Sequence, residues 1–138
     1  MTPDLASQIL IVLCCLCLAF NLYQLSFSYK KMLEEIQVLI DAVKNGEASV
    51  KSLQWMHLFF YGLFPFGLLY LMFEAKFVLW VTLAVGLKFC ISGIWSYRMQ
   101  VNLLNEKTFS KHDFRLHQLD YFLNLVLILL LLAGIFGV

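Results

Sequence analysis

Apolar residues gather in four long runs along the chain, and polar stretches separate them. Each run is close to the roughly 20 residues that a helix needs to cross the hydrocarbon core of a bilayer. The pattern therefore predicts four transmembrane helices, at about residues 5–28, 53–73, 77–97 and 119–138. The expected fold is all-α, an integral membrane four-helix bundle that forms a single domain over residues 1–138.

The polar segment after the first run is amphipathic. Lys30 precedes Glu34 by four residues, and Lys31 precedes Glu35 by four, a spacing that supports a helix. Asn45–Gly46 supplies a helix stop, because glycine readily adopts the left-handed conformation that ends many helices. We expect an amphipathic cytoplasmic extension of the first helix, or a helix that bends to lie on the membrane surface. Its apolar positions recur at helical spacing: Leu33, Ile36, Leu39, Ile40 and Val43.

The second and third runs are joined by a very short turn, residues 74–76, so their helices should pack as an antiparallel hairpin. Pro65 lies inside the second run, with Gly62 and Gly67 on either side. Proline removes one backbone hydrogen bond of a helix, and this predicts a kink. The kink has two interpretations, a functional hinge or a feature of helix packing.

Composition supports the membrane assignment and excludes a soluble domain. The chain is 62% hydrophobic and only 14% charged, whereas soluble domains carry roughly 25% charged residues. Its mean hydropathy is +0.81. The formal net charge of +1 argues against a nucleic-acid partner, which requires a basic surface.

The basic residues are distributed unevenly over the two sides of the predicted bundle. Short basic loops stay in the cytoplasm, so residues 29–52 and 98–118 should be cytoplasmic and both termini should lie on the non-cytoplasmic side. The first run follows Asp4 without a preceding basic residue, which favours an uncleaved helix over a signal peptide. The loop-poor plan suits a bacterial inner membrane. Eight of the ten Lys and Arg residues lie on the cytoplasmic side: Lys30, Lys31, Lys44, Lys51, Arg98, Lys107, Lys111 and Arg115.

Lys88 falls near the middle of the third run, where a charge costs at least about 2.5–3.5 kcal/mol. It could line an ion or proton path, bind a lipid phosphate, or pair with an acid, and a snorkelling or structurally paired lysine is the alternative. Asn21, Asp120 and Asn124 are the polar residues of the other runs that could join it in a polar cavity. Asp120 is expected to be a poor match, because the fourth predicted helix begins beside it, about 15 Å closer to the cytoplasm.

Small residues mark two further helix faces. Transmembrane backbones approach closely where side chains are small, so these faces predict helix association, either within the chain or between chains. We expect a closed cyclic homo-oligomer, with a trimer as the working number, or association with partner membrane subunits. The residues of these faces are Gly86, Cys90, Gly93, Ala133, Gly134 and Gly137.

No motif of an enzyme or a cofactor site is present. The serines stand in no nucleophile motif, so we expect no catalytic residue. His57, His112 and His117 match no metal or haem spacing, and neither metal nor cofactor is expected, although His57 could in principle face His117 across a haem.

Cysteines inside apolar runs pack as small hydrophobic residues. These cysteines are Cys14, Cys15, Cys17 and Cys90.

These observations favour a non-enzymatic, homo-oligomeric inner-membrane protein that binds or organises membrane lipids and supports envelope integrity. Two alternatives remain open. The chain could be an accessory or anchor subunit of a larger respiratory or transport complex. It could also be a small channel or transporter that uses Lys88.

Overall fold

A computed structural model describes residues 2–105 and 108–137. These residues form helices and no strand. Four helices are long and apolar enough to cross a membrane: Asp4–Leu25, Val50–Glu74, Leu79–Leu104 and Lys111–Phe136. The prediction of an all-α chain with four helices of membrane-spanning length is confirmed.

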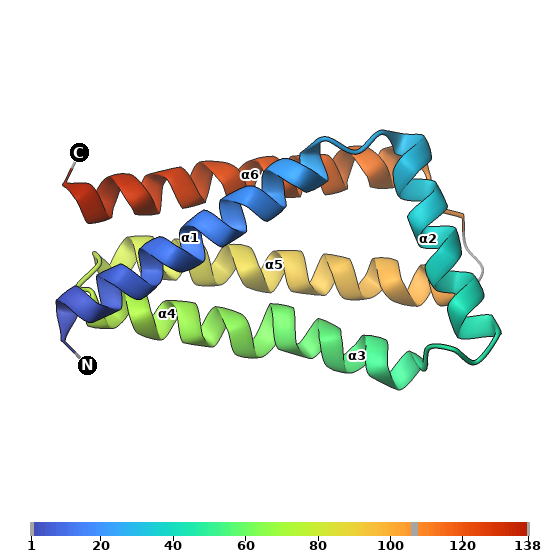
Figure 1. The fold of residues 1–138 in the computed structure, drawn as a ribbon, viewed down its shortest axis with the longest axis horizontal. Coiled ribbons are helices and arrows are strands. Elements are labelled where there is room, and N and C mark those ends of the chain that lie inside the picture. The colour runs from blue at the N-terminus through green and yellow to red at the C-terminus, as the bar shows by residue number, and fades with distance from the viewer. Residues whose placement is uncertain (1, 106–107, 138) are drawn as a thin grey trace.

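The first helix does not continue straight into the amphipathic segment. Helix α1 covers Pro3–Leu25 and ends short of the predicted end at about residue 28, and a separate helix α2 covers Tyr29–Lys44. Ser28 starts α2 as its N-cap, because its hydroxyl accepts the backbone N–H of Lys31 at 3.2 Å. In Figure 1, α2 runs across the ends of the other helices.

The predicted stop after α2 is confirmed. Gly46 adopts a positive φ of 76°. The backbone N–H of Glu47 donates to the carbonyl oxygen of Ala42 at 2.9 Å, and that of Gly46 donates to Val43 at 3.2 Å. These two bonds satisfy carbonyl groups that the last helical turn leaves without partners.

The second span contains a π-helical turn where a kink was expected. It consists of α3 (Val50–Leu58), the π-helical segment η1 (Phe59–Leu63) and α4 (Phe64–Glu74). Within η1 the backbone N–H of Phe64 donates to Phe59, five residues back instead of four. Pro65 follows directly and has no N–H to donate. The wider turn thus accommodates the proline inside one continuous span.

The last two spans extend further towards the α2 end than predicted. Helix α5 covers Leu79–Leu104 and α6 covers Lys111–Phe136, so α6 begins well before the predicted start at about residue 119. A capping box explains this early start. The Ser110 hydroxyl accepts the Asp113 N–H at 3.1 Å, and the Asp113 carboxylate accepts the Ser110 N–H at 2.9 Å.

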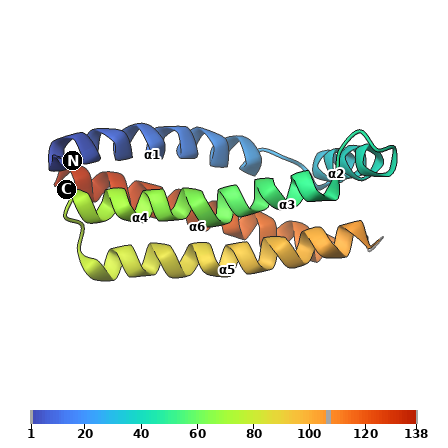
Figure 2. The same ribbon diagram turned by 90° about the horizontal axis from the view of Figure 1, so that it is seen from below.

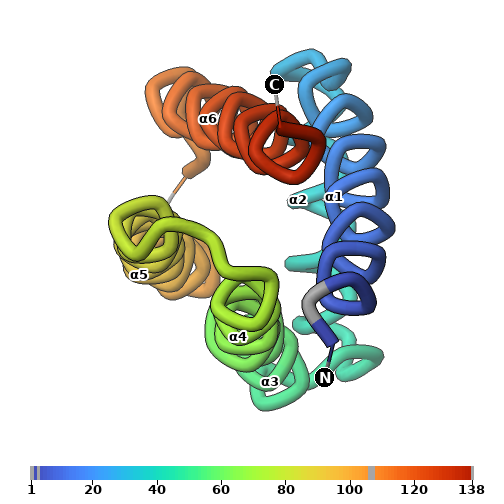
Figure 3. The backbone as a smooth tube through the Cα atoms, turned by 90° about the vertical axis from the view of Figure 1, so that its left-hand side faces the viewer, coloured from blue at the N-terminus to red at the C-terminus, as the bar shows by residue number. Residues whose placement is uncertain are grey.

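The four spans lie along a common direction, with the beginning of α1 and the end of α6 at the end of the molecule opposite α2 (Figures 1 and 2). The α1 helix packs against both α6 and α4, and α5 packs against α4 and η1. The α5 and α6 helices approach each other less closely, as the end-on view shows (Figure 3). Side chains must therefore bridge much of the space between them.

Two apolar clusters occupy the interior, one towards each end. The smaller cluster, at the α2 end, contains the buried side chains of Phe27, Met32 and Phe109. The buried polar side chains of Asn21 on α1 and Ser92 on α5 fall between the two clusters along their helices. The larger cluster draws on all four spans: Leu10, Cys14, Leu68, Met72, Val85, Ile128 and Leu131.

Candidate functional site

Lys88 lies inside the bundle and pairs with an acid. Its Nζ is 3.1 Å from Oδ1 of Asp120, and the two side chains are only 14% and 19% exposed. Nζ also donates a hydrogen bond to Oδ1 of Asn124. The expectation that Asp120 lies too far along the helix axis from Lys88 was wrong. Because α6 begins at Lys111, Asp120 lies nine residues, or about 14 Å, inside that helix.

Ser92 completes this pair and was missed from the sequence. Its hydroxyl donates to Oδ1 of Asp120 at 2.6 Å, and the residue is only 4% exposed. Lys88 and Ser92 are four residues apart on α5, as Asp120 and Asn124 are on α6. Residues at this spacing share one helix face, so two polar faces meet between α5 and α6. Spacing could have indicated each face, but only the packing shows that they meet.

The carboxylate of Asp120 neutralises the charge of Lys88 within the chain. A buried ion pair survives in a low-dielectric interior only when further hydrogen bonds satisfy its remaining groups. Asn124 supplies one such bond to Lys88, and Ser92 supplies one to Asp120. We call these four residues the polar layer. The α5 and α6 backbones approach each other less closely than those of α1 and α6, and the side chains of the polar layer link them.

Histidine and aromatic rings border the polar layer on its α2 side. The ring of His117 lies 5.5 Å from Trp95 and 4.6 Å from Tyr121, measured between centroids. His57 belongs to another group, in which its ring is 4.8 Å from Tyr61. The two histidines therefore sit in separate aromatic clusters. Over the described ranges, 2–105 and 108–137, no group of three or more His, Cys, Asp or Glu could hold a metal ion.

Asn21 is buried on α1, but the structure records no bond from it to Lys88. It is 5% exposed, and its amide donates to the carbonyl oxygen of Cys17 at 2.7 Å. Among the described residues, neither Oδ1 of Asn21 nor Nδ1 of His117 has a hydrogen-bond partner, although both atoms are buried. Buried polar atoms without protein partners are positions where internal water commonly binds.

Three of the predicted association glycines pack within the chain. A Cβ at Gly93 would come within 3.1 Å of Cβ of Tyr61, and one at Gly134 within 3.1 Å of the ring of Phe77. A Cβ at Gly86 would lie 3.4 Å from Leu69. Of the other small residues, Cys90 is exposed, Ala133 is half-buried and Gly137 ends α6 at a positive φ of 72°. Association between chains stays a prediction.

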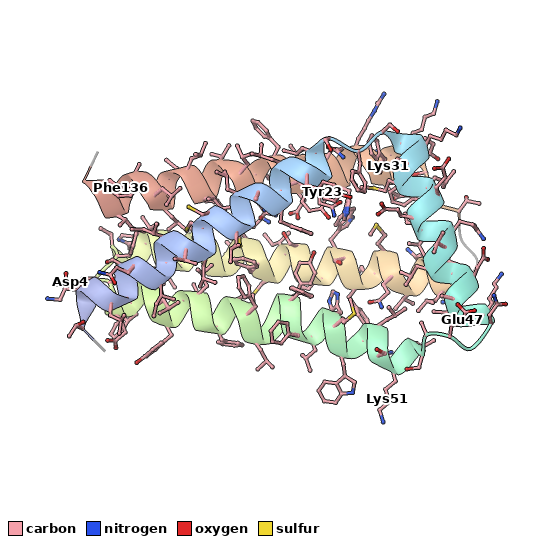
Figure 4. All side chains as sticks on the ribbon, in the orientation of Figure 1. Asp4, Tyr23, Lys31, Glu47, Lys51 and Phe136 are labelled. Atoms are coloured by element: carbon pink, nitrogen blue, oxygen red, sulfur yellow. The ribbon has the colours of Figure 1, made fainter. Side chains whose placement is uncertain are left out.

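Most of the described basic residues lie at the α2 end of the bundle, whereas Lys88 is in the interior and Lys76 lies in the turn between α4 and α5. Figure 4 shows Lys31, Glu47 and Lys51 at this end, with Asp4 and Phe136 at the opposite one. Lys107 belongs to the predicted basic set but lies outside the described residues.

The α2 helix turns Met32 and Ile36 to the bundle, whereas Leu33 and Leu39 of its predicted apolar face are exposed. Met32 is buried and Ile36 packs on the cluster around it. Lys30 and Glu34 form the predicted ion pair on the exposed side, at 3.9 Å. Lys31 instead lies 4.2 Å from the ring centroid of Phe27. This arrangement is typical of a helix at a boundary between apolar and aqueous surroundings.

Two cavities open near the α2 end, and each combines a tryptophan with a cation. We call them the α3 cavity and the α5–α6 cavity, with volumes of about 260 Å³ and 310 Å³. The α3 cavity is an open hollow on the surface of one helix, and it is lined by the exposed side chains of Lys51, Gln54, Trp55 and Leu58. The α5–α6 cavity is lined by Trp95, Arg98, Met99, Asn102, Leu103, Thr108, Phe109 and Asp113.

The molecule thus has a polar layer inside the bundle and two cation-bearing cavities at its basic end. The polar layer is internally paired, and each cavity is lined by a tryptophan and a basic side chain. The chain matches no protein-family model, no curated protein and no solved structure.

Proposed function

We propose that this protein is a non-enzymatic membrane protein that binds and organises phospholipid at its basic end. One observation carries the proposal. An amphipathic helix, α2, lies across the end of the bundle where two cavities each pair a tryptophan with a basic side chain. Tryptophan favours the headgroup zone of a bilayer, and Lys and Arg attract lipid phosphates.

The spacing along α5 supports this placement of the basic end. Arg98 lies ten residues from Lys88, which corresponds to about 15 Å along a helix. The hydrocarbon core of a bilayer is about 30 Å thick. If Lys88 lies near the midplane, Arg98 reaches the boundary between acyl chains and headgroups. Trp95 then lies one turn deeper, where its ring can contact both zones.

The internal pairing of Lys88 moves the proposed lipid contact away from this residue. Asp120 neutralises its charge, and its side chain is only 14% exposed. A lipid phosphate would have to displace Asp120 to reach it. Lys88 in this proposal holds α5 to α6, while Lys51 and Arg98 contact lipid.

A channel or transporter that uses Lys88 has less support. On the side of the polar layer away from α2, the interior is filled by the larger apolar cluster, which includes Leu10, Met72 and Val85. These three side chains are nearly inaccessible to solvent. An ion that reached Lys88 from the basic end would meet this apolar cluster and would find no polar path beyond it.

The exposed surface favours assembly with lipid or further chains. In the most apolar stretch of each span, only 11–22% of the residues are buried within the chain. Acyl chains, further copies or partner subunits must cover the remaining surface. We propose a homo-oligomer surrounded by lipid, with an accessory or anchor subunit of a larger respiratory or transport complex as the second candidate. In this proposal the basic end is cytoplasmic in a bacterial inner membrane, and the lipid organisation supports envelope integrity.

Native mass spectrometry of the protein, gently extracted from its own membrane, tests the proposal. A mass that corresponds to copies of this chain with bound phospholipid is expected. The combined variant Lys51→Gln and Arg98→Gln should retain less phospholipid, whereas the control Lys76→Gln, at the opposite end, should retain as much as the wild type. Equal retention by all three proteins would overturn the proposal, and co-extracted foreign subunits would instead support an accessory subunit.

A further inference from the structure

The α5–α6 cavity carries charges of both signs. The cation is Arg98, near the end of α5, and the anion is Asp113, in the first turn of α6. The hydroxyl of Thr108 adds a neutral polar group to the same wall. The α3 cavity differs, because Lys51 is its only charged lining residue. A ligand with a single negative charge would suit the α3 cavity but would meet Asp113 in the α5–α6 cavity.

Asp113 is held in place with one carboxylate oxygen left for a ligand. Its Oδ2 accepts the Ser110 N–H at 2.9 Å and the Ser110 hydroxyl at 2.6 Å. No hydrogen bond to Oδ1 is recorded within the described part of the chain. The capping box thus fixes the carboxylate on the cavity wall and leaves Oδ1 able to accept a further hydrogen bond.

The apolar part of the cavity suits the glycerol and acyl region of a lipid. Trp95, Met99 and Leu103 lie on the α5 side of the cavity, at successive turns of the helix. Trp95 lies three residues before Arg98 along α5, on the side of Lys88 and the bundle interior. A headgroup that reached Arg98 and Asp113 would therefore place its acyl chains beside apolar side chains. The volume of about 310 Å³ lies at the lower end of small-molecule sites and suits a compact headgroup.

We propose that the α5–α6 cavity binds the headgroup of an aminophospholipid, a phospholipid that carries both a phosphate and a primary ammonium group. The guanidinium of Arg98 pairs with the phosphate, and the ammonium donates to Oδ1 of Asp113. This inference rests on the proposed phospholipid-binding function and adds the class of lipid and the site.

The chemistry of the two charged groups discriminates between headgroups. A choline headgroup has a quaternary nitrogen without an N–H, so it cannot donate a hydrogen bond to Asp113. A glycerol headgroup has no cation, so it leaves Asp113 unpaired beside the phosphate and adds repulsion between like charges. The primary ammonium alone supplies both the charge and the donors.

Competition between lipids with identical acyl chains tests the inference. The full chain is reconstituted in equimolar phosphatidylethanolamine, phosphatidylcholine and phosphatidylglycerol, and the bound lipids are identified by native mass spectrometry. We expect phosphatidylethanolamine to be enriched on the order of fivefold, the scale of one charge-assisted hydrogen bond at a partly exposed site. Asp113→Asn should abolish this enrichment and retain total phospholipid. Arg98→Gln should reduce the amount of every lipid bound at this cavity.

The control separates headgroup binding from helix capping. Ser49→Ala removes the capping hydroxyl of α3, which accepts the Ser52 N–H at 3.0 Å outside this cavity, so its preference for phosphatidylethanolamine should match that of the wild type. Thermal unfolding of both variants establishes that each is folded. Phospholipid retained without preference among the three headgroups, or a preference unchanged in Asp113→Asn, would overturn the inference and leave the proposed function standing. A wild type that retains no phospholipid would overturn the proposed function itself.

Discussion

Lys88 and Asp120 form an ion pair of 3.1 Å in the interior of the bundle, between two helices whose backbones approach each other less closely than those of α1 and α6. Each partner has one further polar contact, Asn124 for the lysine and Ser92 for the aspartate. Because Asp120 neutralises Lys88, the third span does not carry an isolated charge. The pair also identifies how α5 is held to α6.

Breaking the pair from one side should destabilise the fold. Lys88→Met leaves the Asp120 carboxylate buried without its cation, and we expect a loss of about 3 kcal/mol in unfolding free energy. Asp120→Leu leaves the lysine unpaired and should cost a similar amount. The double variant should be more stable than either single variant, because it leaves no unpaired buried charge. Unfolding in detergent, analysed as a double-mutant cycle, measures the coupling, and strictly additive losses would contradict the pairing.

Ser92→Ala tests the hydrogen bond to the aspartate by itself. Removing a hydroxyl that donates to a charged group should cost about 1.5–3 kcal/mol. Ser26→Ala is the matched control, because the Ser26 hydroxyl bonds only to the nearby carbonyl of Tyr23 and is exposed. The two unfolding midpoints are compared under identical detergent conditions. Equal shifts for the two variants would show that the bond from Ser92 to Asp120 contributes nothing specific.

Gly93→Ala tests the close approach of α5 to η1. The added methyl group would lie 3.1 Å from Cβ of Tyr61, so the helices must separate or Tyr61 must shift. Such overpacking should cost about 1–3 kcal/mol. At Gly67 an added Cβ meets nothing within 4 Å, so Gly67→Ala should be neutral or stabilising. Thermal unfolding of both variants decides the matter, and an unaffected Gly93→Ala protein would contradict this packing.

The proposed orientation predicts which residues react with an impermeant thiol reagent applied from outside intact cells. Thr2→Cys should be labelled, because α1 begins at the end opposite α2, whereas Ser49→Cys should react only after the membrane is opened. The unmodified protein supplies the background of its four native cysteines. Labelling of Ser49→Cys in intact cells, with Thr2→Cys protected, would show that the protein has the reverse orientation.

The membrane-spanning helices and the course of α2 were largely predictable. Long apolar runs identify spans because a bilayer core requires about 20 apolar residues, whatever they pack against. Gly46 marked the end of α2 because its backbone conformation is a local property. The π-helical turn before Pro65 was not predictable. The sequence shows only that the proline lacks one backbone N–H, and the way in which the helix adjusts to this depends on how the whole span packs.

The candidate site was predicted only in part, and the start of α6 shows why. Hydropathy placed that start near residue 119, because residues 111–118 are mostly polar, but the Ser110 and Asp113 capping box begins the helix at Lys111. That shift places Asp120 within reach of Lys88. The sequence did not indicate that Ser92 and His117 lie at this layer, because the role of a single serine or histidine depends on which residues of a neighbouring helix it contacts.

The sequence by itself determined that the chain has four apolar spans, an amphipathic helix and one basic end, because these follow from local composition and from the solvent that each segment prefers. Tertiary structure alone decided that Lys88 pairs with Asp120, that Tyr61 packs against Gly93 and that Arg98 and Asp113 line one cavity. These relationships depend on the rotation and relative depth of whole helices. Both are fixed by the packing of many side chains together and cannot be read from the periodicity of any one segment.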